Sequence, residues 1–289
     1  MPIMKELFTF TAYYGSFLAF PFLAGTLWLF LKKRHLFLTG FLILLSLSFI
    51  WSRFVEPQMI VIREVEGPAN FVLISDQHLG QYKGEAFFSR VVERINELDP
   101  DFVLIPGDFV YSIDPTEIEA IFTPFKSFKM PVYAVLGNHD MAPAGELLDS
   151  TLSEILSEYG VTWIDNATVI NNEIQILGLG ERWNNETDLK TFDSLQPDLI
   201  NIAVIHNPDG AYDFPENSLD LIVAGHTHGG QIRIPFLYKW AVPTKYDWGK
   251  AQGWFEILGN PLYITSGLGE TALPMRLFNP PEIVHFQSF

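Results

Sequence analysis

Five short apolar runs, each followed at once by Asp, Asn or His, constrain the fold of this 289-residue chain more than any other feature. The runs are apolar on both faces and rich in β-branched or aromatic residues, which is typical of buried strands. They cover residues 71–74, 102–105, 132–136, 202–205 and 221–224. Apolar residues recur at helical spacing in residues 85–98, 117–128 and 146–159, and such alternation predicts an α/β layered domain. Later runs suggest extra strands, which could form a second sheet: residues 161–164, 174–177, 263–265 and 283–286.

The polar residues that follow the five main runs form the candidate site. They are Ser75-Asp76-Gln77-His78, Pro106-Gly107-Asp108, Gly137-Asn138-His139-Asp140, His206-Asn207-Pro208 and Gly225-His226-Thr227-His228. Five of the seven histidines fall in these segments, and the other two, His35 and His285, are not expected to be ligands. Ligands of open α/β sheets bind beyond the carboxyl ends of the strands. The five segments are therefore expected to meet in one site.

The residue types in these segments indicate a metal centre. The chain has no cysteine, so the ligands are oxygen and imidazole nitrogen, a set that suits Mn²⁺, Fe, Zn²⁺ or Mg²⁺. The candidates outnumber the needs of one ion with an open position, which favours two ions that share a carboxylate. Taken singly, Asp76 and Asp108 could be helix caps or turn residues, and His226 and His228 a structural pair. Five coincident strand ends favour the metal site.

The charge of the chain excludes a nucleic-acid partner. Residues 1–56 carry five basic and two acidic residues, and the remainder carries 13 basic and 32 acidic residues, a net charge of −19. Binding a nucleic-acid backbone requires clustered Lys and Arg. Two dications would attract an anionic substrate despite this acidity.

The first 56 residues predict a membrane anchor. Residues 7–31 carry no formal charge, and residues 36–55 carry only Arg53, whose long side chain can reach the interface. Each run is long enough to cross a bilayer core of about 30 Å. A cleaved signal peptide and a buried soluble helix are the alternatives. The basic turn Lys32-Lys33-Arg34-His35 predicts a cytoplasmic loop, which places the following domain outside the cytoplasm.

The five segments, in this order and rough spacing, resemble those of the calcineurin-like metallophosphoesterases over about residues 70–270. His206-Asn207-Pro208-Asp209, Gly225–Gln231 and the stretch from Pro274 to Ile283 resemble a bacterial membrane-associated branch. That branch includes cell-envelope phosphodiesterases and chlamydial-type UDP-2,3-diacylglucosamine pyrophosphatases. The resemblance implies a four-layer α/β/β/α sandwich over residues 57–289, behind an anchor of residues 1–56 in the bacterial cell membrane.

The resemblance also implies a role for each site residue. Asp76, His78 and His228 would hold the first metal, and Asn138, His206 and His226 the second, with Asp108 bridging. Mn²⁺ is the favoured ion. His139 would be catalytic, stabilising the transition state or protonating the leaving oxygen, with Asp140 orienting it. A metal-bound hydroxide would attack a phosphodiester, phosphomonoester or pyrophosphate bond.

The sequence leaves several readings open. The substrate could be lipid-linked, and hydrolysis of UDP-2,3-diacylglucosamine in lipid A biosynthesis is an alternative function. A non-catalytic membrane-tethered scaffold is an alternative of another class. Gly137, Gly225, Gly229 and Gly230 could be turn glycines or permit close approach of ligands. Arg276 could contact phosphate or make a structural hydrogen bond. The aromatic residues between Phe236 and Phe255 could fill the second sheet or form a rim that meets lipid.

Overall fold

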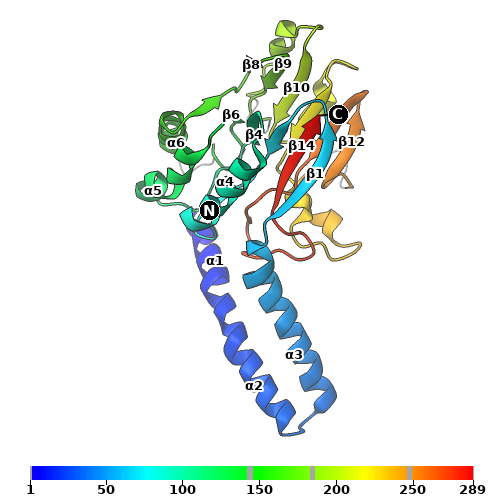
Figure 1. The fold of residues 1–289 in the computed structure, drawn as a ribbon. Helices are drawn as coiled ribbons and strands as arrows, with labels where there is room; N and C mark the ends of the chain where they lie inside the picture. Colours follow the sequence, from blue (N-terminus) through cyan, green and yellow to red (C-terminus); the bar gives the residue numbers. More distant parts are fainter. Residues whose placement is uncertain (1, 142–145, 183–185, 246–248, 289) are drawn as a thin grey trace.

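A computed structural model describes residues 2–141, 146–182, 186–245 and 249–288 of the chain (Figure 1). Two sheets of six strands pack face to face, and a pair of long N-terminal helices extends away from them. The predicted four-layer sandwich is confirmed.

The first sheet contains the first three predicted strands. Its order is β1 (Val61–Gly67), β14 (Glu282–Ser288), β2 (Phe71–Leu73), β4 (Phe102–Pro106), β6 (Val132–Val135) and β7 (Val161–Trp163). Neighbouring strands are parallel except for β14 and β2. The carboxyl ends of β2, β4 and β6 therefore lie at one edge.

The second sheet contains the other two of the five main predicted strands. The later runs at residues 174–177 and 263–265 join this sheet, whereas those at 161–164 and 283–286 belong to the first as β7 and β14. Its order is β12 (Gly253–Ile257), β13 (Asn260–Ile264), β11 (Leu221–Ala224), β10 (Ile200–Ile205), β9 (Ile174–Gly178) and β8 (Ala167–Asn171). The inner strands β13, β11, β10 and β9 are parallel, and both edge strands are antiparallel to their neighbours. Parallel strands buried on both faces explain why these runs are apolar without alternation.

The core between the sheets is aromatic on the side of the first sheet. The ring of Phe71 stacks between Phe102 and Phe286, with centroid distances of 5.3 and 4.5 Å. Ile202 and Leu221 of the second sheet belong to the same buried cluster. This packing fixes the two sheets against each other.

Helices cover the outer face of the first sheet. They are α4 (Glu85–Leu98), α5 (Ile118–Phe122), the 3₁₀-helix η5 (Thr123–Ser127) and α6 (Glu146–Glu158). The single helix predicted over residues 117–128 is wrong in detail, because 3₁₀-helices flank α5. Pro124 lies at the start of η5 and has no backbone N–H to continue an α-helix. On the second sheet, the outer layer is made of short 3₁₀-helices, η6 (Leu189–Ser194) and η7 (Pro208–Asp213).

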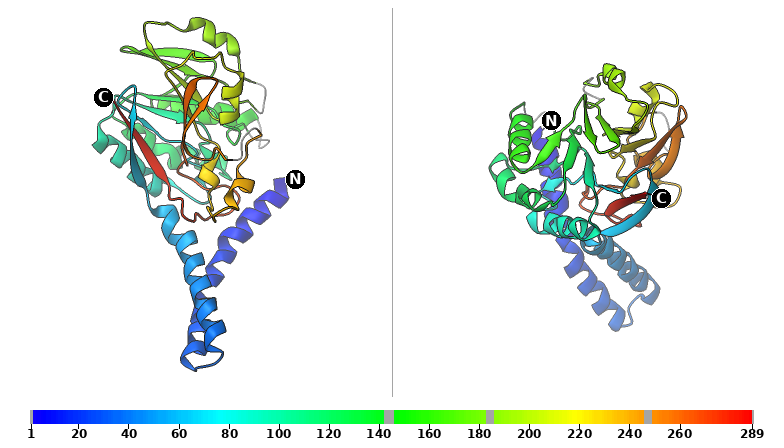
Figure 2. Two further views of the ribbon diagram at one scale, coloured as in Figure 1. Left: turned by 90° about the vertical axis from the view of Figure 1, so that its right-hand side faces the viewer. Right: turned by 45° about the horizontal axis from the view of Figure 1, so that its top comes forward.

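The N-terminal segment forms two helical rods joined at the basic turn (Figure 2). The first rod comprises α1 (Pro2–Gly15), η1 (Ser16–Leu18) and α2 (Ala19–Leu31), and the second comprises α3 (Leu36–Ile50), the π-helix η2 (Trp51–Val55) and η3 (Glu56–Gln58). Two stretches, Leu7–Leu31 and Leu36–Gln58, are long and apolar enough to cross a membrane, by length and composition. Most of their residues are exposed, so they are not core helices of the folded domain.

The second rod ends in direct contact with the sandwich. The backbone N–H of Arg276 donates to the carbonyl of Ser52 at 2.8 Å. The backbone N–H of Asn279 donates to the buried Glu56 carboxylate at 2.5 Å. The first rod makes a further contact, because Tyr13 stacks on Tyr82 of the domain at 6.0 Å. The rods are thus docked on the domain at their upper ends.

Candidate metal centre

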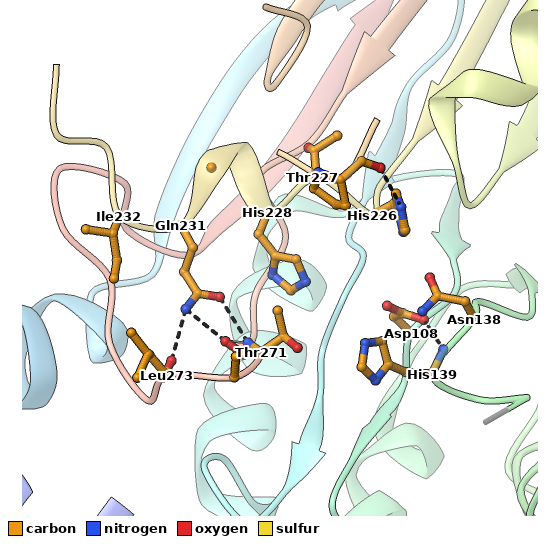
Figure 3. Close-up of a pocket in the computed structure, with 13 residues that line it drawn as sticks. Asp108, Asn138, His139, His226, Thr227, His228, Gln231, Ile232, Thr271 and Leu273 are labelled. Carbon is orange, nitrogen blue, oxygen red and sulfur yellow. Dashed lines mark hydrogen bonds between the residues drawn. The ribbon is translucent and has the colours of Figure 1, made fainter. Parts of the chain in front are cut away.

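The predicted site residues meet where the carboxyl ends of the two sheets adjoin. Loops after β2, β4 and β6 of the first sheet face loops after β10 and β11 of the second. Between them lies a cavity of about 330 Å³. Asp108, Asn138 and His139 line one side of it, and His228 lies across from them (Figure 3).

One cluster of ligand atoms joins Asp76, His78, Asp108 and His228, all within 4.8 Å of one another. The Nε2 atoms of His78 and His228 face each other at 3.1 Å. Asp108 Oδ2 lies 3.4 Å from His78 Nε2, and Asp76 Oδ1 lies 3.6 Å from His228 Nε2. Two carboxylates and two imidazoles therefore surround one point.

A second cluster joins Asp108 to His206 and His226. His206 Nε2 lies 3.4 Å from Asp108 Oδ2 and 3.1 Å from His226 Nδ1. Asn138 Oδ1 lies 3.0 Å from the same His206 nitrogen, which adds an amide oxygen to the set. Asp108 is common to both clusters, and the same Oδ2 atom faces a histidine of each.

Backbone carbonyls orient three of the four histidines. Their distal ring nitrogens lie near the carbonyl oxygens of Val110, Pro106 and Pro243: His78 Nδ1 at 3.2 Å, His206 Nδ1 at 2.7 Å and His226 Nε2 at 3.0 Å. A carbonyl can only accept, so the proton resides on that nitrogen of each ring. The other nitrogen of each ring faces the cluster. This arrangement is the usual support of a metal-ligating histidine.

The charge state of the rings follows from burial and from Asp108. Burial lowers the pKa of His78 and of His226 to about 3, so both rings are neutral at physiological pH. Burial also disfavours charge on His206, but Asp108 beside it raises the pKa of His206 to about 10. Burial raises the pKa of Asp76 to about 7. Despite burial, His206 and His139 hold the pKa of Asp108 well below its ordinary value.

Asp140 positions the backbone of two loops. Its Oδ2 accepts hydrogen bonds from the N–H groups of Asp108 and Gly137, and its Oδ1 from those of Phe109 and Val110. These partners differ from the predicted one, the imidazole of His139. The loop needs a carboxylate here because four N–H donors converge on one buried group.

His139 lies half-buried at the wall of the cavity, as Figure 3 shows. Its ring is perpendicular to that of His78, with a centroid distance of 4.8 Å. Its backbone N–H donates to Asp108 Oδ1 at 2.8 Å. That bond leaves Oδ2 of Asp108 to face the two histidine clusters.

The backbone is strained at five of the seven predicted ligands. Positive φ angles, from 44° to 70°, occur at Asp76, His78, Asp108, His226 and His228. Non-glycine residues rarely adopt this region, and such strain concentrates at functional sites. The sequence alone did not predict these positive φ angles.

Two of the predicted glycines permit close approach. A Cβ atom on Gly225 would collide with the Ser75 hydroxyl and the Asp76 carboxylate. One on Gly137 would collide with the Asp108 carboxylate. Gly229 and Gly230 instead have positive φ angles of 58° and 78°, as turn glycines do.

Arg276 has a structural role. The side chain is fully buried, and its guanidinium donates to Glu270 and to the carbonyls of Ser266, Gly267, Gly269 and Asn279. A phosphate in the cavity cannot reach it. His285 does not line the cavity, and its Nε2 lies 2.9 Å from Asn70 Oδ1.

A loop that the sequence did not predict closes one side of the cavity. Thr271, Ala272 and Leu273 line it. Gln231 holds this loop through bonds to the Thr271 and Leu273 carbonyls and from the Thr271 N–H (Figure 3). Gln231 stood in the conspicuous Gly225–Gln231 segment, but nothing in the sequence linked it to residue 271.

The aromatic residues between Phe236 and Phe255 differ in their surroundings. Trp254 lies on β12 and packs edge-on against Tyr263 and Phe286, so it belongs to the second sheet. Phe236 and Trp240 are strongly exposed. Tyr246 and Trp248 lie outside the described residues.

The donor atoms of both clusters fit divalent cations. Ring nitrogens and carboxylate oxygens converge in both clusters, and the buried His228 Nδ1 has no hydrogen-bond partner within the described part of the chain. Neutral imidazoles and carboxylates without thiolates form a set for intermediate or hard dications. The sequence prediction of a metal site is therefore supported by the chemistry of the donors.

The amino-acid sequence is similar to those of known phosphoesterases. The family model named calcineurin-like phosphoesterase matches residues 69–230. The uncharacterized metallophosphoesterase YkuE of Bacillus subtilis is 28% identical, over 82% of this chain and 88% of its own length. Phosphodiesterase YaeI of Escherichia coli is 26% identical, over 81% and 87%. The UDP-2,3-diacylglucosamine pyrophosphatase LpxG of Chlamydia muridarum is 24% identical, over 82% and 92%.

The matched region begins before Asp76 and ends after His228, so it contains every residue of both clusters. It also covers more than half of the chain, including strands of both sheets. The chain is a metal-dependent hydrolase that belongs to the calcineurin-like phosphoesterase family.

Proposed function

We propose that the chain is a membrane-tethered phosphoesterase that holds two divalent cations, Mn²⁺ being the favoured ion. Asp76, His78 and His228 would hold the first, His206, His226 and Asn138 the second, and Asp108 would bridge them. The observation that carries the proposal is the position of Asp108 Oδ2, 3.4 Å from His78 Nε2 and from His206 Nε2. A single carboxylate oxygen between two imidazole sets is what a shared ligand requires.

The bound cations would neutralise phosphoryl oxygens and lower the pKa of the attacking water. Side chains of the protein would supply the other functional groups that the reaction needs. Asn138 and His139 present an amide and an imidazole to the same cavity. His139 belongs to neither ligand cluster, and its ring packs edge-on against that of His78 at a centroid distance of 4.8 Å. We assign it the protonation of the leaving oxygen, a role suited to an imidazole.

Substituting His139 and Asp108 tests whether the first residue acts in proton transfer and the second in metal binding. His139→Ala should lower turnover of a phosphodiester by about 100-fold or more and leave the metal content unchanged. Asp108→Ala should lower both metal content and turnover. His35→Ala, in the turn between the rods, serves as the control. Full activity of metal-reconstituted His139→Ala protein would refute the assigned role.

The exposed apolar rods support an anchor of residues 1–56 and a catalytic domain of residues 57–289. The basic turn favours a domain outside the cytoplasm. A reporter fused to the C-terminus, compared with one inserted in the turn, tests the orientation: only the turn reporter should be active on the cytoplasmic side.

The similarity to LpxG supports a second candidate, hydrolysis of the pyrophosphate bond of UDP-2,3-diacylglucosamine. That substrate is cytoplasmic, so a cytoplasmic C-terminus would favour it, and an extracytoplasmic one would favour a lipid-linked phosphate ester of the cell envelope. Parallel assays with a monoester, a diester and a lipid-linked pyrophosphate separate the reactions. A non-catalytic scaffold lacks support, because neither ligand cluster is incomplete.

A further inference from the structure

Six exposed apolar side chains lie on the two chain segments that line one side of the cavity with Ile232 and Leu273, and they are named here the apolar rim. The rim comprises Ile234, Phe236, Leu237, Trp240, Leu273 and Phe278. Phe236, Trp240 and Phe278 are the most exposed, at 89%, 75% and 70%. A soluble surface rarely gathers aromatic residues this exposed, and such a patch marks a contact site.

The rim lies at the end of the domain on which the rods dock. Ile232 pairs with Leu277, which ties the segment carrying residues 234–240 to the one carrying Phe278. The second segment is bonded to the end of the second rod through Arg276 and Asn279. Figures 1 and 2 show the yellow-to-orange segment before β12 at the end of the domain next to the top of α3.

The backbone is strained at the two phenylalanines of the rim. Phe236 and Phe278 have φ angles of 69° and 55°. A bulky side chain in this region is a genuine conformational outlier and persists only where the surrounding structure enforces it. The chain thus holds two large apolar side chains in solvent at a cost in strain, although burying them would be favourable.

The charge around the rim suits an anionic membrane surface. The chain has a formal net charge of −16, yet residues 231–240 contain Arg233 and Lys239 and no acidic residue. Lys239 is exposed between the rim residues Leu237 and Trp240. Trp with neighbouring Lys is a typical composition for the headgroup region of a bilayer.

We infer that the apolar rim inserts into the leaflet from which the domain emerges, as a second membrane contact besides the rods. The inference rests on the proposed anchoring of residues 1–56. Ile232 and Leu273 border the cavity at the rim, so insertion would set the cavity mouth at headgroup level (Figure 3). The site would then take phosphate esters whose apolar part remains in the bilayer.

Single cysteines provide the test, because the chain has none of its own. Full-length Phe236→Cys and Phe278→Cys variants carry an environment-sensitive fluorophore in vesicles of phosphatidylethanolamine and phosphatidylglycerol. Lipids with a quencher on the acyl chain should quench both probes. Leu44→Cys, exposed on α3, is the positive control for the rods. Ile170→Cys, exposed on β8 in the domain, is the negative control and should stay unquenched.

The controls separate the inference from the anchoring on which it rests. Quenching at Leu44→Cys without quenching at positions 236 and 278 overturns the inserted rim and leaves the anchor intact. No quenching at Leu44→Cys overturns the anchor and the rim together. A label at 236 or 278 that is shielded from aqueous quenchers only as the protein concentration rises would show that a second copy covers the rim, which also overturns the inference.

An activity assay provides an independent readout. The double variant Phe236→Ser, Phe278→Ser should hydrolyse a phosphodiester carried by a vesicle lipid several-fold more slowly than the parent protein. Its activity on a soluble chromogenic diester should be unchanged, as should both activities of Ile170→Ser. Equal losses on the two substrates would contradict a role in membrane contact.

Discussion

Asp140 supports the site although it belongs to neither ligand cluster. Each of its carboxylate oxygens accepts two backbone N–H bonds, and these bonds hold the Asp108 loop against the Gly137 loop. Asp140 thus helps to fix the position of Asp108 between the two histidine clusters.

Asp140→Asn should therefore destabilise the protein. An amide nitrogen would face two N–H donors and leave them unpaired, at a cost of about 2–3 kcal/mol of unfolding free energy. Denaturant titration in detergent would measure this loss, and the metal content should fall with it. The control is Asp114→Asn, because Asp114 caps an exposed 3₁₀-helix and Asn is an equally good cap. Unchanged stability of Asp140→Asn would contradict the positioning role.

The protonation of the ligands predicts the pH dependence of metal binding. A cation must displace the proton of His206, whose pKa is about 10, at every pH between 6 and 8. Below about pH 7 it must also displace one from Asp76, whose pKa is about 7. Affinity for Mn²⁺ should therefore rise with pH from 6 to 8, and more steeply at the acid end.

Calorimetric titration in two buffers of different ionisation enthalpy would count the released protons. The count should be higher at pH 6 than at pH 8. A metal affinity that does not change with pH would show that the ligands are already deprotonated in the metal-free protein.

At the level of elements, the docked end of the second rod reaches the metal site through one residue. Asn279 Nδ2 donates to the carbonyl of His228 at 2.6 Å, while its backbone N–H donates to Glu56. Asn279 therefore contacts both the second rod and a predicted ligand.

Asn279→Ala should lower metal affinity by about 10-fold or more, in the range found for residues that orient ligands. The reason is that the buried carbonyl of His228 loses its partner. Equilibrium dialysis against Mn²⁺ would measure the change. Asn70→Ala is a matched control, because Asn70 supports His285, a histidine outside both clusters. Equal effects of the two substitutions would rule out a specific support of His228.

The strand ends could be predicted from the sequence, and the loops between them could not. Strands such as β4 and β11 are apolar on both faces and end two residues before Asp108 and His226, so one sequence pattern indicates both the fold and the site. The helix predicted over residues 117–128 failed in detail at Pro124, where local backbone chemistry overrode apolar spacing. The loop at residues 271–273 depends on Gln231 and on tertiary contacts about 40 residues apart, which leave no local pattern.

At the level of the whole molecule, the two clusters connect the two sheets. Asp76, His78 and Asp108 follow strands of the first sheet, and His206, His226 and His228 follow strands of the second. A cation bound by both sets holds the sheets together at their carboxyl edge.

Metal removal should therefore lower the midpoint of thermal unfolding. A ligand that binds only the folded state stabilises it in proportion to the logarithm of its concentration, by about 2.7 kcal/mol at 100 times Kd. Differential scanning fluorimetry of the detergent-solubilised protein, with and without EDTA, would measure the shift. Asp108→Ala should show little shift, since its clusters have lost their common ligand. An EDTA effect of equal size in Asp108→Ala would point to a metal elsewhere.

The spacing of the ligands along the chain also bears on the order of biosynthesis. His78 and His228, whose Nε2 atoms face each other, are 150 residues apart. Chains fold domain by domain as they emerge from the ribosome, and contacts this distant form late. The first half of a nascent chain exposes Asp76, His78 and Asp108 without their partners, so it has no complete set with which to retain a cation. A complete set of ligands is therefore expected only after synthesis has passed residue 228 and the second sheet has packed against the first.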